Sequence, residues 1–286
     1  MRQQHTLCRS TVVCGIGLHS GARVSATLRP APANSGVTFF DGGAPDAPGW
    51  PARFDQVTTT RLATTLGNGP HRVSTVEHLM AALLAEEIDN VEIVVTGNEI
   101  PVLDGSAAQW VTMLREVGRQ VQPAPRRRLV IRRPVEVREG MCWARLSPRE
   151  DAGLTLTATI AFDHPRIGTQ TLSMRLGSKS FAEQLSWART FGFLRDVERL
   201  RSAGLARGGS LENVVVYDEN DVVNPEGLRG ADEAIRHKLL DMVGDLALVG
   251  CPVEGHFEAH RPGHALNHRL VNRLFEIPDA WEVREG

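Results

Sequence analysis

The feature that most constrains the fold is that predicted strands and helices are interleaved in both halves of the chain. In the first half, a strand predicted over residues 91–96 separates two amphipathic helical segments. In the second half, alternating segments at 129–137 and 154–162 precede a long apolar helix predicted over 231–249. Interleaved elements of this kind predict an α+β fold, in which sheets pack against helices.

A segment rich in proline and arginine, residues 119–128, divides the chain. Its prolines interrupt both the helical and the strand periodicity, so it is the best candidate for a linker. We therefore predict two α+β domains, residues 1–122 and 129–280, that resemble each other in the order of their elements. A chain of 286 residues is long enough to bury a core in each of them.

The first helix has a recognisable start. Ser74 and Glu77 have the spacing of a capping box, and Leu79 and Leu83 follow on one apolar face. The sequence therefore predicts a helix that starts near Ser74, with the Glu77 carboxylate bound to the backbone of its first turn.

The charge balance argues against a nucleic-acid partner. The chain carries 32 lysine and arginine residues against 34 aspartate and glutamate residues, for a net charge of −2. Nucleic-acid-binding domains usually show a basic excess. The one basic run, Arg126 to Arg128, is interpreted as a solvated linker or strand edge.

The cysteines and the N-terminus indicate a cytoplasmic protein. The four cysteines are widely spaced without a C-x-x-C pair, which favours free thiols in a reducing compartment. The N-terminal segment has no apolar signal region, and no stretch approaches the roughly 20 apolar residues of a membrane span.

A pattern on the long helix could bind a metal ion. His237 and Asp241 are four residues apart, so their side chains lie on one helix face, and Asp245 follows one turn later. That spacing allows an imidazole and a carboxylate to hold one ion. By itself the pattern is weak, because a surface ion pair between histidine and aspartate has the same spacing.

A third ligand would have to come from another element, and His78 on the first helix is the candidate. A catalytic zinc usually has three protein ligands and one open position for water, so His78, His237 and Asp241 would form such a set. Glu77 would then be free to accept a proton from the water. The alternatives are a capping role for Glu77 and a half-buried structural role for His78. The H-E-x-x-H metalloprotease motif is absent.

A third histidine with a candidate role, His264, follows Gly263 at the start of the last predicted helix. Near an acid such as Asp245 its imidazole would be biased toward the protonated form. A protonated histidine suits a general acid or a clamp on an oxyanion.

Together, these segments resemble one family, the UDP-3-O-acyl-N-acetylglucosamine deacetylases of lipid A synthesis. Seven motifs occur in the family's order across nearly the whole chain, which makes the resemblance highly specific. They are GIGLHSG (15–21), LRPAPANSGV (28–37), STVEHLMAAL (74–83), EIPVLDGSA (99–107), ARTFGFLRD (188–196), HKLLDMVGDL (237–246) and GHALN (263–267).

The resemblance implies two similar α+β domains with the active site between them. It also implies a small insert in each domain, near residues 40–60 in the first and near 193–223 in the second. The second insert resembles the one that forms a hydrophobic passage for the acyl chain. Its apolar residues could equally pack the insert onto its own domain.

The resemblance also implies roles for single residues. His78, His237 and Asp241 match the zinc ligands, Glu77 matches the general base, and His264 matches the charged histidine that stabilises the oxyanion or protonates the leaving amine.

Five further positions match residues around that centre. Asp245 matches the acid that orients the charged histidine, and Thr190 matches a hydroxyl that contacts the tetrahedral centre. Lys238, Phe191 and His19 match residues that line the substrate site.

The implied reaction is the zinc-dependent removal of the N-acetyl group from UDP-3-O-(3-hydroxyacyl)-N-acetylglucosamine, the committed step of lipid A synthesis. The cofactor is expected to be Zn²⁺, with Fe²⁺ able to serve in cells. We expect a monomer with no nucleic-acid partner and at most a weak peripheral contact with the membrane. Two alternatives remain open, a binding module without activity and a metallohydrolase for another acylated amino sugar.

Overall fold

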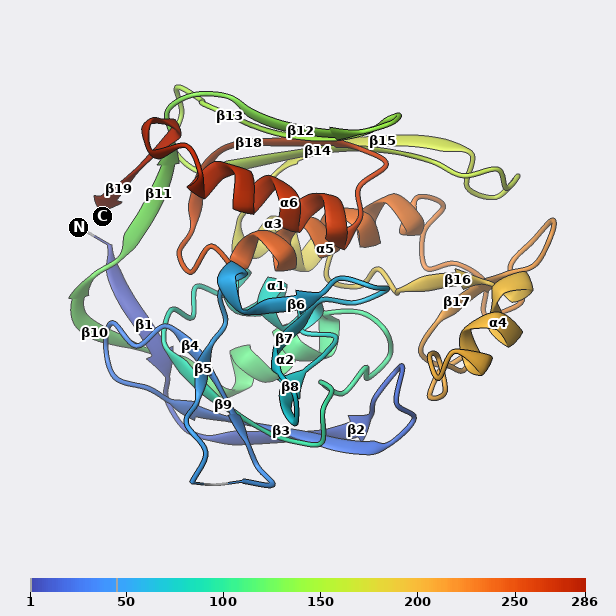
Figure 1. The fold of residues 1–286 in the computed structure, drawn as a ribbon, viewed down its shortest axis with the longest axis horizontal. Helices are drawn as coiled ribbons and strands as arrows, with labels where there is room; N and C mark the ends of the chain where they lie inside the picture. The colour runs from blue at the N-terminus through green and yellow to red at the C-terminus, as the bar shows by residue number, and fades with distance from the viewer. Residues whose placement is uncertain (1, 45) are drawn as a thin grey trace.

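The computed structural model, which describes residues 2–44 and 46–286, contains two sheets that enclose the main helices between them. One sheet lies along the top of Figure 1 and the other along the bottom, and the helices fill the space between the two. Both termini lie at the same side of the molecule. The expected α+β fold, with sheets packed against helices, is confirmed.

The sheet nearer the N-terminus buries one face against the helices. Its β4 and β9 are parallel, whereas the other neighbouring strands are antiparallel. In β3, Val24, Ala26 and Leu28 are buried and alternate with more exposed residues, as expected for a strand with one face on the core. The strands lie in the order β2 (Thr11–Ile16), β3 (Arg23–Pro30), β9 (Val91–Thr96), β4 (Val37–Asp41) and β5 (Trp50–Pro51).

The second sheet is built around β18. Leu146, Phe257 and Leu156 lie opposite one another on neighbouring strands and form a buried row across the sheet. The strands lie in the order β12 (Val135–Glu139), β13 (Cys142–Ser147), β18 (Val253–His260), β11 (Arg127–Ile131) and β19 (Trp281–Glu285), and β14 (Leu154–Ala161) joins β18 to β15 (Thr169–Arg175).

Two helices meet at the centre of the molecule, α1 (Glu77–Ala85) and α5 (Glu233–Ala247). Gly244 allows their close approach, because a Cβ atom there would lie 2.1 Å from the carbonyl oxygen of Glu77. A side chain at this position would therefore push the helices apart. The other helices are α2 (Ala108–Val117), α3 (Ser178–Gln184), α4 (Val197–Ser202) and α6 (His264–Phe275).

The remaining elements are short. The pair β16 and β17 lies with α4 at one side of the molecule, at the right of Figure 1, within the region expected to hold the second insert. The elements are β1 (Gln3–Leu7), η1 (Phe54–Gln56), β6 (Val57–Thr59), β7 (Thr65–Asn68), β8 (His71–Val73), β10 (Arg119–Pro125), β16 (Phe191–Phe193), η2 (Leu194–Asp196), β17 (Val215–Tyr217) and η3 (Pro278–Ala280).

The expected linker at residues 119–128 is instead largely β-structure. Residues 119–125 form β10, which pairs antiparallel with β1 near the N-terminus. The prolines are tolerated because this ribbon has two strands only, so each strand has an edge that needs no donor. Arg126 is buried and contacts the carboxylates of Glu87 and Asp89, so it is not the solvated residue that the sequence suggested.

The predicted capping box of the first helix is wrong. The helix begins at Glu77, three residues later than expected, and no side chain caps it. The Ser74 hydroxyl accepts a hydrogen bond from the Thr65 hydroxyl at 3.0 Å, and the Glu77 carboxylate accepts one from the backbone N–H of Thr64. Contacts with a distant segment have therefore replaced the local cap, and they leave Glu77 facing the centre of the molecule.

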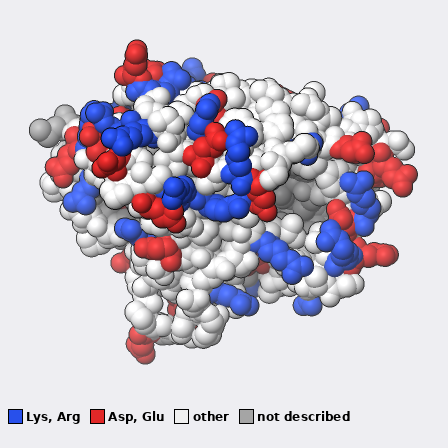
Figure 2. All heavy atoms as spheres, turned by 45° about the horizontal axis from the view of Figure 1, so that its top comes forward, with Lys and Arg blue, Asp and Glu red and all other residues white. Residues whose placement is uncertain are grey.

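Charges of both signs are interspersed on the face shown in Figure 2. Many arginines of the protein lie beside a carboxylate, as in the contact between Arg145 and Glu258. The four cysteines are free thiols, as expected. Among the described residues, no helix is long and apolar enough to cross a membrane.

Candidate active site

Three predicted ligands come together where α1 and α5 meet. The ligand atoms of His78, His237 and Asp241 all lie within 4.8 Å of one another. Oδ1 of Asp241 is 3.3 Å from Nε2 of His237 and 3.8 Å from Nε2 of His78. Two imidazole nitrogens and one carboxylate oxygen thus converge on one point, as the donors of a catalytic zinc site do.

The protonation of these three groups suits metal binding. Their side chains are 5%, 2% and 4% exposed. Burial and the neighbouring His237 lower the pKa of His78 to about 3, and burial also lowers the pKa of His237. Burial alone would raise the pKa of Asp241, but Lys238 and the histidines outweigh it and hold that pKa below its usual range. Neutral imidazoles and an ionised carboxylate are the forms that bind a cation.

Two neighbours orient the ligands. The carbonyl oxygen of Ala188 is 3.0 Å from Nδ1 of His237, and because a carbonyl can only accept, Nδ1 carries the hydrogen and Nε2 keeps its lone pair. The ammonium group of Lys238 donates to Oδ2 of Asp241 at 2.6 Å, which leaves Oδ1 facing the histidines. The ligand atoms of His237 and Asp241 are thereby aimed at the same point.

Glu77 lies beside this cluster and is buried. Its Oε2 accepts the backbone N–H of Thr64 at 3.1 Å, and its Oε1 lies 3.7 Å from Nε2 of His264. Burial raises the pKa of Glu77 to about 7, and the carboxylates of Asp241 and Asp245 add to the shift, against the opposing effect of His264. A carboxylate with a pKa near neutrality can accept and return a proton during turnover.

His264 is held as a cation on the other side of Glu77. Its Nδ1 donates to Oδ2 of Asp245 at 2.8 Å. Burial favours the neutral imidazole, but Asp245 and Glu77 outweigh that effect and raise the pKa of His264 to about 10. A base and a charged acid therefore lie side by side next to the ligand cluster, an arrangement suited to hydrolysis of an amide.

Lys238 and Phe191 are brought to the same place. The Lys238 ammonium lies 5.7 Å from the centre of the Phe191 ring, and the ring is 6.3 Å from that of His237. The ring is also one member of an aromatic group that includes Phe162, Phe193 and Tyr217. An apolar wall thus begins at the ligand cluster.

Thr190 and His19 lie in two different loops. The Thr190 backbone donates to Gly105 at 2.8 Å and accepts from Val215 at 2.8 Å, two residues beyond the carbonyl that orients His237. Burial lowers the pKa of His19, and the nearby charge of His264 contributes to the shift, although Glu99 opposes it. Nε2 of His19 is buried, with no hydrogen-bond partner among the described residues. All ten predicted site residues are thus near the α1–α5 junction or in segments that contact it.

Three functional contacts were missed by sequence reasoning. Thr64 donates its hydroxyl to Oδ1 of Asp245 at 2.7 Å, while its N–H binds Glu77, so it joins Glu77 to the carboxylate that pairs with His264. Asn267 donates to Oδ2 of Asp245 at 2.8 Å. The backbone of Ala188 orients His237. Asn267 lies within the GHALN motif and could have been found there, whereas no sequence signal marks the other two.

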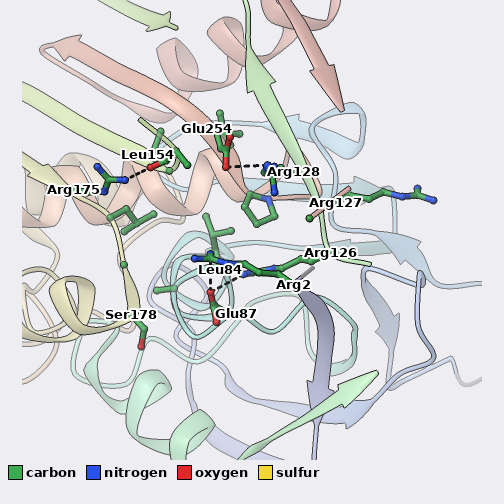
Figure 3. A pocket seen from close by; sticks show the side chains of 18 residues that line it. Arg2, Leu84, Glu87, Arg126, Arg127, Arg128, Leu154, Arg175, Ser178 and Glu254 are labelled. Atoms are coloured by element: carbon green, nitrogen blue, oxygen red, sulfur yellow. Dashed lines mark hydrogen bonds and ion pairs between the residues drawn. The ribbon is translucent and has the colours of Figure 1, made fainter. Parts of the chain in front are cut away.

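A separate cavity of about 490 Å³ opens at the far end of α1, beside Leu84 and Glu87 (Figure 3). None of the ten predicted site residues lines it. Several arginines do, and their guanidinium groups contact carboxylates of the chain itself, as Arg126 contacts Glu87 and Arg128 contacts Glu254. The cavity is therefore distinct from the candidate active site.

Comparisons with known proteins agree with the site. The sequence matches the family model described as "LpxC: UDP-3-O-acyl N-acetylglycosamine deacetylase" over residues 4–276. It is 48% identical over 280 residues to the UDP-3-O-acyl-N-acetylglucosamine deacetylase of Myxococcus xanthus. The aligned region covers 98% of this chain and 88% of that protein. The proteins of the same name from Anaeromyxobacter dehalogenans and Oleidesulfovibrio alaskensis are each 46% identical, over 98% of this chain and 90% and 91% of their own lengths.

Proposed function

Because the chain belongs to the UDP-3-O-acyl-N-acetylglucosamine deacetylase family, we propose that its cluster of His78, His237 and Asp241 holds the catalytic metal ion of that reaction. The observation that carries this proposal is the convergence of three buried donor atoms within 4.8 Å, beside a carboxylate and a charged histidine.

The enzyme is a metal-dependent amidase of lipid A synthesis. It removes the N-acetyl group from a UDP-linked 3-O-acyl glucosamine and releases the free amine and acetate. An amide is a poor electrophile and water is a poor nucleophile, so the site has to activate both. When bound, a divalent ion supplies this activation by lowering the pKa of water and polarising the carbonyl group.

We propose zinc as that ion. Two imidazoles and one carboxylate form a donor set that zinc accepts. The Nδ1–H tautomer of His237 and the contact of Asp241 with Lys238 leave one atom of each for the ion, which suits a four-coordinate site with one open position. Iron(II) binds similar donors, so its availability in the cell would decide between the two.

Glu77 is proposed as the general base. Its Oε2 is held by Thr64, and its Oε1 faces His264 and remains available to a water molecule. With a pKa of about 7, the carboxylate is a base strong enough to accept a proton and an acid strong enough to return it.

His264 is proposed to bind the developing oxyanion or to protonate the leaving amine. Its positive charge is maintained by Asp245, which also accepts hydrogen bonds from Thr64 and Asn267 and is thereby fixed in place. The Thr190 hydroxyl is proposed as a second donor to the tetrahedral centre.

Lys238, Phe191 and His19 are proposed to line the substrate site. The Phe191 ring separates the ligand cluster from the aromatic group of Phe162, Phe193 and Tyr217, which supports a passage for an acyl chain in the insert near 193–223. Burial lowers the pKa of His19, and the nearby charge of His264 adds to the shift, so His19 lies close enough to His264 to support a place beside the substrate.

We further propose a division into domains of residues 1–122 and 129–280. The division is supported by strand pairing, because β10 pairs with β1 whereas β11 pairs with β18 and β19 of the other sheet. A cytoplasmic monomer, with at most a weak peripheral contact to the membrane that supplies the acylated substrate, is our proposal for its working state.

Acetate release from UDP-3-O-(3-hydroxyacyl)-N-acetylglucosamine tests the proposed metal. Chelation should abolish release, and about one equivalent of zinc should restore it. The control is the same protein kept in buffer without the chelator. Release that persists after complete metal removal would contradict the proposed cluster, whereas no release from zinc-loaded protein at any acyl length would favour a binding module.

The pH dependence of kcat/KM should be bell-shaped. Glu77 has to be ionised to act as a base, so activity should fall as the pH drops below about 7, and the charge of a bound metal should move this limb lower. His264 has to be protonated, so activity should fall as the pH rises through about 10. A basic limb that persists unchanged in His264→Ala would exclude His264 as its source.

A further inference from the structure

A buried ion pair between Arg189 and Glu233 lies just behind the proposed metal ligands. The two side chains are 2% and 1% exposed, and Nε of Arg189 donates to Oε1 of Glu233 at 2.9 Å. Nη2 of Arg189 donates to Oε2 of the same carboxylate at 3.2 Å. The carboxylate also accepts the backbone N–H of Arg189 at 3.0 Å and that of Arg229 at 2.7 Å. Four donors therefore hold this one side chain.

The guanidinium group of Arg189 is fully occupied by contacts within the protein. Its Nη1 donates to Glu226 at 2.6 Å, and its Nη2 donates to the carbonyl oxygen of Gly227 at 2.8 Å in addition to Glu233. Each of its three nitrogens is thus bound within the protein. Any role of Arg189 in the reaction has to act through other residues.

The position of this pair connects it to a proposed ligand. Glu233 lies in the first turn of α5, one turn before His237 on the same face. Arg189 immediately follows Ala188, whose carbonyl oxygen accepts the Nδ1–H of His237. Helix α5 therefore contacts the loop at two points. Glu233 accepts the N–H of Arg189, and His237 donates to the carbonyl of Ala188.

The other side of the loop is also fixed. The backbone of Thr190 donates to Gly105 and accepts from Val215. Rotation of the Ala188–Arg189 peptide is thus opposed by contacts on both sides, and the ion pair is the only one of these contacts that involves charged side chains. A buried ion pair adds little net stability compared with apolar residues of the same shape, so a positioning role is a better reason for its presence.

We propose that Arg189 and Glu233 are positioning residues that keep the Ala188 carbonyl in place, and so hold His237 as the Nδ1–H tautomer with Nε2 free for the metal. This proposal rests on His237 being a ligand. Loss of the pair would let the Ala188–Arg189 peptide turn, and the imidazole would lose the acceptor that selects its tautomer. Thr190, which continues the same loop, would be displaced with it.

Glu233→Gln in the full-length protein tests the proposal, since the amide keeps the size but cannot accept both backbone and guanidinium hydrogens. We expect the dissociation constant for zinc, measured by competition with a chelator, to rise roughly 10- to 100-fold, as for other contacts behind metal ligands. In the metal-free protein, ¹⁵N NMR of the His237 ring should show a loss of the Nδ1–H tautomer. A merely structural role would leave the tautomer unchanged.

The matched control is Asp232→Asn, which removes a partly exposed ion pair with Arg236 at the start of α5. Its zinc affinity and its His237 tautomer should equal those of the unaltered protein. If Glu233→Gln does not fold, Arg189→Lys serves instead, because it keeps the charge but loses the two-pronged contact and should give a smaller change in the same direction.

The outcomes separate this proposal from the proposed function. A folded Glu233→Gln or Arg189→Lys protein with unchanged zinc affinity and tautomer would overturn the positioning role, even if His237→Ala still abolished binding. Unchanged zinc binding in His237→Ala would instead overturn the ligand set. A weakened zinc affinity with an altered His237 tautomer, absent in Asp232→Asn, would support the proposal.

Discussion

Replacing Glu77 by glutamine should lower kcat for acetate release by roughly 10²- to 10⁴-fold, the usual contribution of a general base. The amide has the same shape and its oxygen can still accept the N–H of Thr64, so the fold around α1 should persist. It cannot take a proton from water. Metal content, measured by mass spectrometry of the purified protein, should stay at about one equivalent.

The opposite end of the same helix provides the control for Glu77. Glu86 follows α1 and pairs with Arg115 in a partly exposed site, so Glu86→Gln should leave kcat unchanged. Full activity of Glu77→Gln would remove Glu77 as the base. A large loss of metal from Glu77→Gln would show that the carboxylate belongs to the binding site instead.

Replacing His237 by alanine should abolish both metal retention and activity. The change leaves two protein donors, and the loss of zinc affinity should exceed the roughly 10- to 100-fold effect of contacts behind the ligands. It also leaves the Ala188 carbonyl without its donor, which costs about 1–3 kcal/mol of folding free energy. Chelator competition measures the affinity, and thermal unfolding shows whether the protein remains folded.

Two further variants make the His237 result specific. Asp241→Asn keeps the size of a second ligand but removes its charge, and it should weaken zinc binding in the same direction. His256→Ala alters a half-buried histidine on β18 that lies outside the cluster, so its zinc affinity should not change. Tight zinc binding by both His237→Ala and Asp241→Asn would mean that the metal sits elsewhere.

Local patterns predicted the regular elements well where one face is buried. The strand expected at 91–96 is β9, and the helix expected at 231–249 is α5 with bounds two residues shorter at each end. The alternating segment at 129–137 is two strands, β11 and β12, with Pro134 in the break between them. Proline removes a donor from the ladder, so the segment cannot continue as one strand.

Patterns failed where pairing partners are distant. The segment at 119–128 shows no strand or helix periodicity. It forms β10 because it pairs with β1, which lies more than 100 residues earlier in the chain. Ser74 and Glu77 have the spacing of a capping box, yet Thr65 and Thr64 bind them instead. A local motif predicts the hydrogen bonds that a side chain can form within one helical turn. It does not predict which competing partner from another segment the fold brings closer.

The sequence by itself determined that His237 and Asp241 share one face of α5, since helix geometry places them there whatever surrounds them. The order of seven motifs likewise determined the family. Only the tertiary structure decided that α1 crosses α5 at Gly244 and brings His78 to Asp241.

The tertiary structure also decided the charge states of Glu77 and His264. The pKa of Glu77 depends on burial, and that of His264 depends on Asp245, which Thr64 and Asn267 hold from two other segments. Burial and long-range hydrogen bonds exist only once the chain has packed, so no local pattern in the sequence could supply them.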